Sequence, residues 1–180
     1  LEHTDYLGKT IPEIAYEKAG IIKDRCPVVT CERDPSVLGL FQDTCARREC
    51  SLVRIGSDFD VSNVRQSLSG TSFDYEGNGR LSDLRVRLLG AYQAENAGAA
   101  VAIVRQLSRK DLHFTEEEIR KGLSRAKWPG RLDVVSEKPF LMFDGSHNPD
   151  GARTTSETLE SLRVTPLTFV LACMNDKDAM

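Results

Sequence analysis

The chain has 180 residues, 40% of them hydrophobic and 28% charged, a balance typical of a globular protein with a buried core. Its net charge of -3 and pI near 5.7 argue against a nucleic-acid surface, which needs a basic patch. No apolar run is long enough to span a bilayer and no signal peptide opens the chain, so we expect no nucleic acid and no membrane as partners.

The ends and the cysteines indicate the context of the chain. It begins without an initiator methionine and stops shortly after a strand-like run, so we expect it to be a piece of a larger protein. An odd number of cysteines without a secretion signal favours reduced thiols in the cytoplasm. Two pairs, Cys26–Cys31 and Cys45–Cys50, share one spacing, which makes a zinc site worth considering. Ordinary burial of these cysteines explains them better. The cysteines are Cys26, Cys31, Cys45, Cys50 and Cys173.

Short helices and strands alternate at the start of the chain. Thr10-x-x-Glu13 is a capping box with Pro12 in the first turn, and it predicts a helix from Ile11 to Ala19, ended by Gly20. Beyond it we expect strands over 27–30 and 51–55, with a helix over 34–48 between them.

The middle of the chain has a different pattern. Residues 71–75 and 81–88 flank Gly77-Asn78-Gly79 and predict a β-hairpin. An alanine-rich helix follows over 92–107, and its small residues favour close packing on a sheet. A second capping box, Thr115-x-x-Glu118, predicts a helix to about residue 125.

Trp128-Pro129-Gly130 predicts a domain boundary, which divides the chain into residues 1–127 and 128–180. After it we expect strands over 132–135 and 140–143, a helix over 151–162 and a strand over 167–172. The β-α-β order of the last three elements predicts a right-handed parallel crossover in a second α/β domain.

The loop after residues 140–143 is the most informative stretch. It reads Asp144-Gly145-Ser146-His147-Asn148-Pro149, a strand–loop–helix junction of the kind that holds ligands in α/β proteins. Asp144 could accept bonds from sugar hydroxyls, or it could only cap the helix near Pro149. His147 could donate to an anion, or it could only satisfy loop carbonyls.

Lys18 and His3 are the candidate metal residues. A lysine among apolar neighbours has its neutral amine favoured, and the carbamate it forms with carbon dioxide suits magnesium. Read from the residues alone, Lys18 is more simply a surface lysine paired with Glu13 or Glu17. His3 could complete a metal shell, although a lone histidine is usually structural.

Asn96 and Arg131 are the candidate nucleotide residues. The Asn96 amide can donate and accept, as an adenine edge requires, but it could simply bond to helix backbone. Arg131 follows a proline–glycine turn, where its planar fork could hold phosphate or form an interdomain salt bridge.

In their order, these motifs make the chain resemble the folylpolyglutamate synthase/dihydrofolate synthase family of the Mur ligase superfamily. The matching motifs, including an Asp-Lys-Asp loop at the end of the chain, run through almost its whole length. They are His3-Thr4-x-Tyr6-Leu7-Gly8, the run from Glu17 to Lys23, Leu89-Gly90-Ala91-Tyr92-Gln93 with Asn96-Ala97, Trp128-Pro129-Gly130-Arg131-Leu132, Asp144-Gly145-Ser146-His147-Asn148-Pro149 and Asn175-Asp176-Lys177-Asp178.

The resemblance implies an α/β fold, with the later part of a central ATPase domain over 1–127 and the start of a Rossmann-like domain over 128–180. It implies an ATP- and magnesium-dependent ligase that joins L-glutamate to a folate or dihydropteroate carboxylate through an acyl phosphate. A cytoplasmic enzyme that is a monomer at full length is expected.

Particular residues acquire roles from the same resemblance. Lys18 matches a lysine that becomes carbamylated, and His3 matches a magnesium ligand. Asn96, Arg131 and Asp144 match residues that contact ATP, with Arg131 near the phosphates and Asp144 near the nucleoside. The remaining match, His147, lies on the active-site face of the family's carboxy-terminal domain, and it is with Lys18 a candidate catalytic residue.

The chain also departs from the family pattern. Tyr92 stands where the family usually has histidine, and Ser146 where it has alanine. The 180 residues contain no G-x-x-x-x-G-K-[ST] phosphate loop, so we expect the isolated chain not to turn over. Two other functions stay open: a Mur-type ligase that joins an amino acid to a UDP-sugar peptide precursor, and a non-catalytic nucleotide-binding module.

Overall fold

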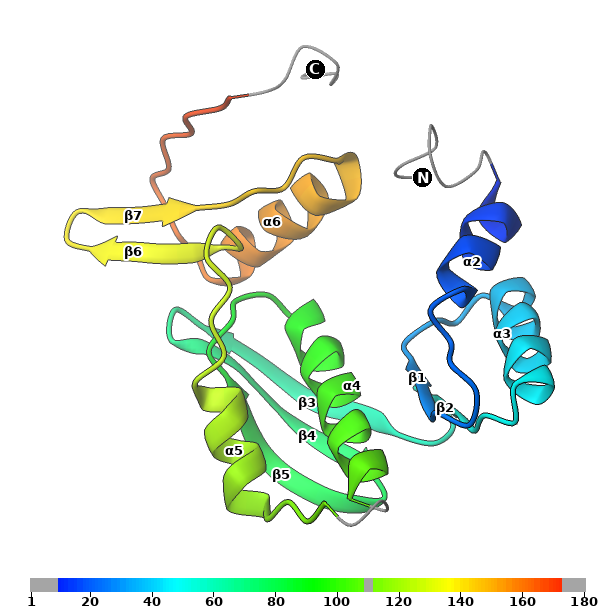
Figure 1. Cartoon of the computed structure of the whole chain (residues 1–180). Coiled ribbons are helices and arrows are strands. Elements are labelled where there is room, and N and C mark those ends of the chain that lie inside the picture. The colour runs from blue at the N-terminus through cyan, green and yellow to red at the C-terminus, as the bar shows by residue number, and fades with distance from the viewer. Residues whose placement is uncertain (1–9, 109–111, 173–180) are drawn as a thin grey trace.

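The computed structural model describes residues 10–108 and 112–172, and Figure 1 shows their elements in three groups. The first group contains α2 (Ile11–Ala19), β1 (Val28–Thr30), α3 (Pro35–Arg47) and β2 (Leu52–Arg54). The two strands pair in parallel, with Val28 opposite Leu52. The capping box predicted for α2 is confirmed, because the Thr10 hydroxyl accepts from Glu13 N and the Glu13 carboxylate accepts from Thr10 N.

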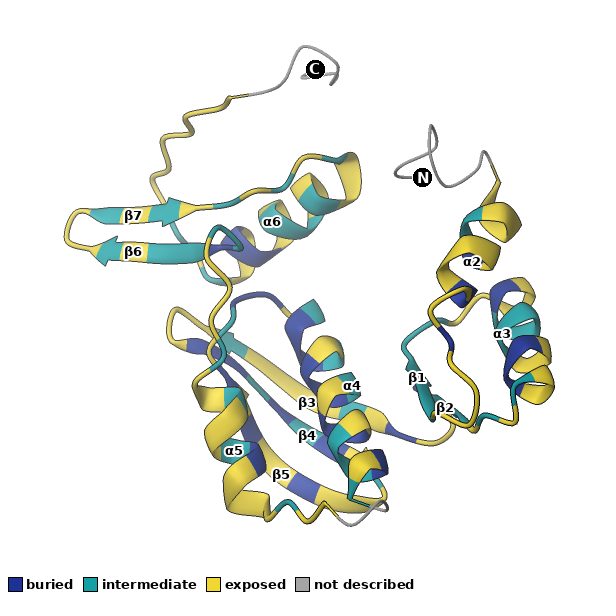
Figure 2. Ribbon diagram, viewed as in Figure 1, coloured by how far each residue is buried: buried dark blue, intermediate teal, exposed yellow. Residues whose placement is uncertain are grey.

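The second group is an antiparallel sheet with two helices. Its strands are β3 (Asp60–Ser67), β4 (Gly70–Gly77) and β5 (Gly79–Val86), and its helices are α4 (Tyr92–Leu107) and α5 (Glu116–Ser124). Helix α4 packs against β3 and β4, while α5 lies along β5 (Figure 1). Figure 2 shows the buried residues concentrated between this sheet and α4.

The main hydrophobic core belongs to this second group. Phe73 and Leu84 have no exposed surface, and Val101 of α4 is 1% exposed. Gly98 lets α4 approach the sheet, because a Cβ there would lie 2.5 Å from Val61 Cγ1. The hairpin predicted from residues 71–88 is confirmed as β4 and β5. Strand β3 was not predicted, because most of its residues are polar and exposed and show no apolar alternation.

The third group contains β6 (Asp133–Glu137), β7 (Phe140–Phe143) and α6 (Pro149–Ser161). Strands β6 and β7 pair antiparallel, with Asp133 opposite Phe143. The strand expected over 167–172 is wrong for this structure, where these residues form no strand and Val170 is 94% exposed. Apolar composition marks a strand candidate, but a strand forms only where a neighbour supplies hydrogen bonds. The parallel crossover predicted with it is therefore also absent from the described residues.

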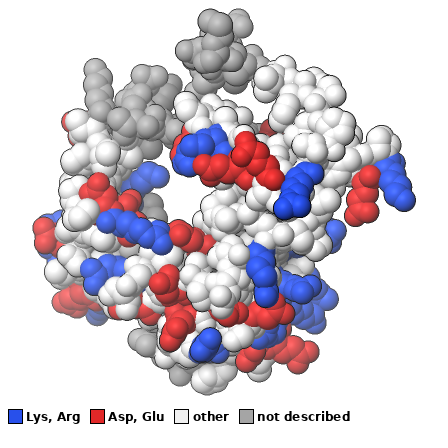
Figure 3. All heavy atoms as spheres, turned by 180° about the vertical axis from the view of Figure 1, so that it is seen from behind, with Lys and Arg blue, Asp and Glu red and all other residues white. Residues whose placement is uncertain are grey.

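None of the helices described by the structure is both long and apolar enough to cross a membrane. Figure 3 shows acidic and basic side chains interspersed on one face of the molecule.

Candidate functional site

A pocket of about 280 Å³ lies where the first turn of α4, the turn before β6 and the start of α6 meet. Arg131 belongs to its wall, and we call it the Arg131 pocket. The ring of Tyr92 from α4 forms another wall. Polar side chains at the start of α6 form the rest, among them Ser146, His147, Asn148 and Thr154.

Asp144 joins the two loops that flank this pocket. Its Oδ2 accepts from the backbone N–H of Leu132 at 2.8 Å, and its Oδ1 accepts from Ser146 N at 2.7 Å. A backbone bond of 2.7 Å from Gly145 N to Gly130 O reinforces this connection. The residues on both sides of Arg131 are therefore fixed. The carboxylate binds the turn that carries the arginine.

The alternative interpretation of Asp144 as a helix cap is wrong. The N-cap of α6 is Asn148, whose Oδ1 accepts from Gly151 N at 2.6 Å. Asn148 fits this position better because it directly precedes Pro149, the first residue of the helix.

His147 lies on the wall of the Arg131 pocket. Its Nδ1 is 3.0 Å from the carbonyl oxygen of Gly145. A carbonyl can only accept, so Nδ1 carries the hydrogen in this bond. The interpretation that His147 satisfies a loop carbonyl is therefore confirmed. The same bond orients the exposed ring at the edge of the pocket.

Tyr92 supplies the aromatic wall of the pocket. Burial raises the pKa of its phenol, and this effect outweighs the lowering caused by a Gln93 hydrogen bond and by the Arg131 charge; Asp144 raises the pKa further. The phenol is therefore neutral near pH 7. In the sequence, Tyr92 stands out only as a departure from the family pattern. The sequence signal for its position is Gly90, two residues earlier, which lies against the Tyr92 ring.

Gly90 leaves the space that this ring fills. Its φ of 106° is a conformation that favours glycine, and a Cβ there would lie 2.3 Å from Cε1 of Tyr92. The ring therefore packs directly over the glycine backbone, which fixes its direction at the start of α4.

Asn96 lies one helical turn after Tyr92 and is exposed. Its Nδ2 donates to the side-chain oxygen of Gln93 at 3.1 Å, so the amide bonds a side chain rather than the backbone considered from sequence. Asn96 is not part of the wall of the Arg131 pocket, although it shares the first turns of α4 with Tyr92.

The structure does not bring Lys18 to the Arg131 pocket. Lys18 is exposed on α2 rather than enclosed by apolar neighbours, as a surface lysine would be. His3 lies outside the described residues. Over 10–108 and 112–172, no three His, Cys, Asp or Glu side chains gather into a group that could hold a metal ion.

Known proteins match this chain over almost its whole length. The chain is 36% identical over 180 residues to the folylpolyglutamate synthase of Lacticaseibacillus casei. This alignment covers 99% of this chain and 42% of that protein. It is 31% identical to the dihydrofolate synthase/folylpolyglutamate synthase of Bacillus subtilis over 98% of this chain and 42% of that protein. The chain is homologous to the folylpolyglutamate synthase/dihydrofolate synthase family. It spans about two fifths of the length of these relatives.

Solved structures of the family agree with this assignment. The apo form of the L. casei enzyme superposes with a TM-score of 0.88 at 36% identity, covering 93% of this chain and 41% of that one. A folylpolyglutamate synthase complex with AMPPCP and folate gives a TM-score of 0.86 at 36% identity, with the same coverage. The Mycobacterium tuberculosis enzyme complexed with ADP gives 0.78 at 32% identity, covering 89% and 36%. A scan against protein-family models gave no match. The α/β class predicted from the sequence is confirmed, and the predicted resemblance to this family is confirmed as homology over 99% of the chain.

Proposed function

We propose that this chain is part of an ATP-dependent ligase that adds L-glutamate to the carboxylate of folate or dihydropteroate. The homology over 99% of the chain carries this proposal. The Arg131 pocket supports it, because two predicted site residues, Arg131 and His147, line it and a third, Asp144, fixes its loops. We assign residues 1–127 to the central ATPase domain and 128–180 to the start of the carboxy-terminal domain of a cytoplasmic, monomeric enzyme.

The proposed reaction has two steps. The substrate carboxylate attacks the γ-phosphorus of ATP, the bond to ADP breaks, and an acyl phosphate forms. The glutamate amine then attacks the acyl carbon, and phosphate leaves from the tetrahedral intermediate to give an amide. Charge accumulates on phosphoryl oxygens in the first step, so fixed cationic donors at that point stabilise it.

Arg131 is suited to that task. Its planar guanidinium matches the geometry of phosphate oxygens and always carries a charge. The backbone on each side of it is held by the bonds from Leu132 N to Asp144 and from Gly145 N to Gly130 O. Little backbone freedom therefore remains to be lost at this turn when the side chain takes up a phosphate. Asp144 then acts by positioning Arg131.

Magnesium is the proposed cation, with His3 and a carbamate on Lys18 as ligands. Resemblance alone supports these two residues, since the described part of the chain forms no metal group by itself. When bound, the ion would neutralise charge on the phosphoryl oxygens. Mass spectrometry under native conditions tests the assignment: a labile carboxyl adduct on Lys18 is expected, and an unmodified Lys18 in the metal-loaded enzyme contradicts it.

The proposed activity is tested on the full-length protein that carries this chain, by ATP-dependent incorporation of labelled glutamate into folate and into dihydropteroate. Arg131→Ala is expected to lower kcat by about 100-fold or more. Arg65→Ala is the matched control, because Arg65 is an exposed arginine of β3 that is not part of the pocket wall. It should leave kcat unchanged.

Other outcomes would contradict the proposal. Transfer of an amino acid to a UDP-sugar peptide, without transfer to folate or dihydropteroate, would indicate a Mur-type ligase. ATP binding without any transfer would indicate a nucleotide-binding module. For the 180-residue chain alone we expect no ADP release with folate and glutamate, because these residues include no phosphate loop.

A further inference from the structure

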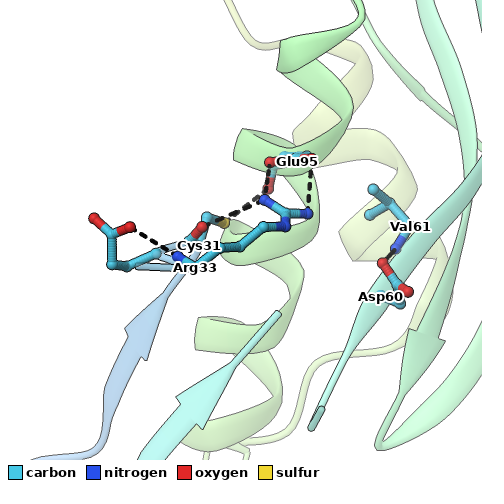
Figure 4. A network of polar contacts seen from close by, with 6 residues as sticks. Cys31, Arg33, Asp60, Val61 and Glu95 are labelled. Atoms are coloured by element: carbon cyan, nitrogen blue, oxygen red, sulfur yellow. Dashed lines mark hydrogen bonds and ion pairs between the residues drawn. The ribbon is translucent and has the colours of Figure 1, made fainter. Parts of the chain in front are cut away.

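A bidentate ion pair between Arg33 and Glu95 joins segments that are 62 residues apart in the sequence (Figure 4). Nη1 and Nη2 of Arg33 each donate to one carboxylate oxygen of Glu95, both at 3.0 Å. Arg33 lies between β1 and α3, and Glu95 lies in the first turn of α4. Two parallel bonds fix the orientation of both groups, which a single contact would not do.

The segment that carries Arg33 is itself firmly held. Oε1 of Glu32 accepts from the backbone N–H groups of Arg33 at 2.8 Å and Asp34 at 2.9 Å. Asp34 in turn caps α3 by accepting from Ser36 N at 2.8 Å. Nearby, the Cys31 thiol donates to the main-chain oxygen of Glu95 at 3.7 Å. The backbone that carries Arg33 is therefore held in place by these hydrogen bonds.

The start of α4, by contrast, has no side-chain cap. Its N-cap is Ala91, whereas α2, α3, α5 and α6 are capped by side chains. Without a side-chain cap this turn depends on other contacts: Gln93 N and Ala94 N donate to the carbonyls of Gly90 and Ala91, and Ala94 is fully buried. The helix dipole favours the negative charge of Glu95 at this end of the helix. The guanidinium of Arg33 binds the Glu95 carboxylate and so connects the turn to the segment between β1 and α3.

This first turn also carries groups of the site. Tyr92 forms a wall of the Arg131 pocket, and Asn96 follows Glu95 directly. We infer that the Arg33–Glu95 pair positions the first turn of α4, so that Tyr92 and Asn96 are presented correctly to the nucleotide. The inference rests on the proposed ATP-dependent function. Both side chains are substantially exposed, 57% for Arg33 and 39% for Glu95, so the pair contributes little to global stability.

The test uses the full-length ligase and measures KM for ATP, kcat and Tm. Arg33→Gln and Glu95→Gln should each raise KM for ATP about threefold to tenfold, because misplacement of binding groups weakens the complex. The double variant should be no worse than either single variant, since both remove the same interaction. Arg33→Lys should rescue only in part, because an ammonium cannot make the parallel pair of bonds.

Arg65→Gln supplies the matched control. It breaks a pair that is more exposed than Arg33–Glu95, with Arg65 Nη2 2.8 Å from Asp83 Oδ1, and neither residue is part of the pocket wall. It should leave KM for ATP unchanged, with a Tm close to that of Arg33→Gln.

Three results would overturn the inference. The first is an unchanged KM for ATP in both single variants, and the second is an additive double variant. The third is a KM rise in Arg65→Gln equal to that in Arg33→Gln. If the unmodified enzyme transfers no glutamate, the proposed function fails and the inference fails with it. An active enzyme with insensitive variants rejects the inference alone.

Discussion

Replacement of Asp144 by asparagine tests the role of this carboxylate in joining the two loops. The carboxylate accepts two backbone N–H groups, from Leu132 at 2.8 Å and from Ser146 at 2.7 Å. Asparagine keeps the shape but has one acceptor oxygen, so one N–H group loses its partner and faces an amide donor. Bonds to a charged acceptor contribute about 1.5–3 kcal/mol, so we expect a loss of about 2 kcal/mol.

A loss of this size is measurable in a chain of this length. For 150–250 residues, each kcal/mol lowers Tm by about 2–4 °C, so Asp144→Asn should lower it by about 4–8 °C. Thermal unfolding followed by far-UV circular dichroism measures this change. Fluorescence of Trp128, the chain's single tryptophan, reports locally, because its carbonyl accepts from Arg131 N in the turn that Asp144 holds.

A neighbouring carboxylate provides the control. Oδ2 of Asp133 accepts only a longer bond, 3.3 Å from Gly130 N, so Asp133→Asn should cost less than about 1 kcal/mol. An Asp144→Asn variant with the same Tm as the unmodified chain would refute this role of Asp144, as would an Asp133→Asn variant that is destabilised to the same extent.

Three further changes have defined outcomes. Gly90→Ala should destabilise by about 2–4 kcal/mol in urea titration, since it combines a φ of 106° with a steric clash, whereas Gly39→Ala, with no atom within 4 Å, should stabilise slightly. Leu84→Ala should lower the free energy of unfolding by about 2–5 kcal/mol, because Leu84 has no exposed surface; a smaller change would disprove its core role. Bonds from Thr115 lower the pKa of Glu118, so this stabilisation is present above the ordinary value of 4.5 and is lost as the pH falls through the lowered one. Glu118→Gln, which removes the titrating carboxyl, should reduce the acid dependence of the melting temperature, and an unaltered dependence would contradict this assignment.

Local signals in the sequence predicted most of the elements. The capping boxes at Thr10 and Thr115 gave correct helix starts, because a cap is made within four residues. Non-local pairing was predicted less well. Strand β3 has a polar, exposed sequence and exists because β4 pairs with it. The segment 167–172 has a strand composition but no strand neighbour among the described residues.

The site shows the same division. The ordered motifs predicted that Arg131 and Asp144 both contact ATP, which stays a prediction, and the structure joins their segments through the bond from Leu132 N to Asp144. The pairing of Arg33 with Glu95 left no sequence signal, because their 62-residue separation is closed only by the packing of α4 beside β1. The roles of Lys18 and of residue 3 stay predictions.

The two-stranded β6–β7 sheet has a consequence for handling the chain. Within the described residues β7 pairs only with β6, so its outer edge presents unpaired amide and carbonyl groups. Leu141 is 48% exposed and Phe143 57%, and both lie along this strand. Further strands can pair with an uncovered edge beside apolar side chains, so we expect concentrated solutions of the chain to form intermolecular ladders. Light scattering against concentration will reveal this before any loss of helix content.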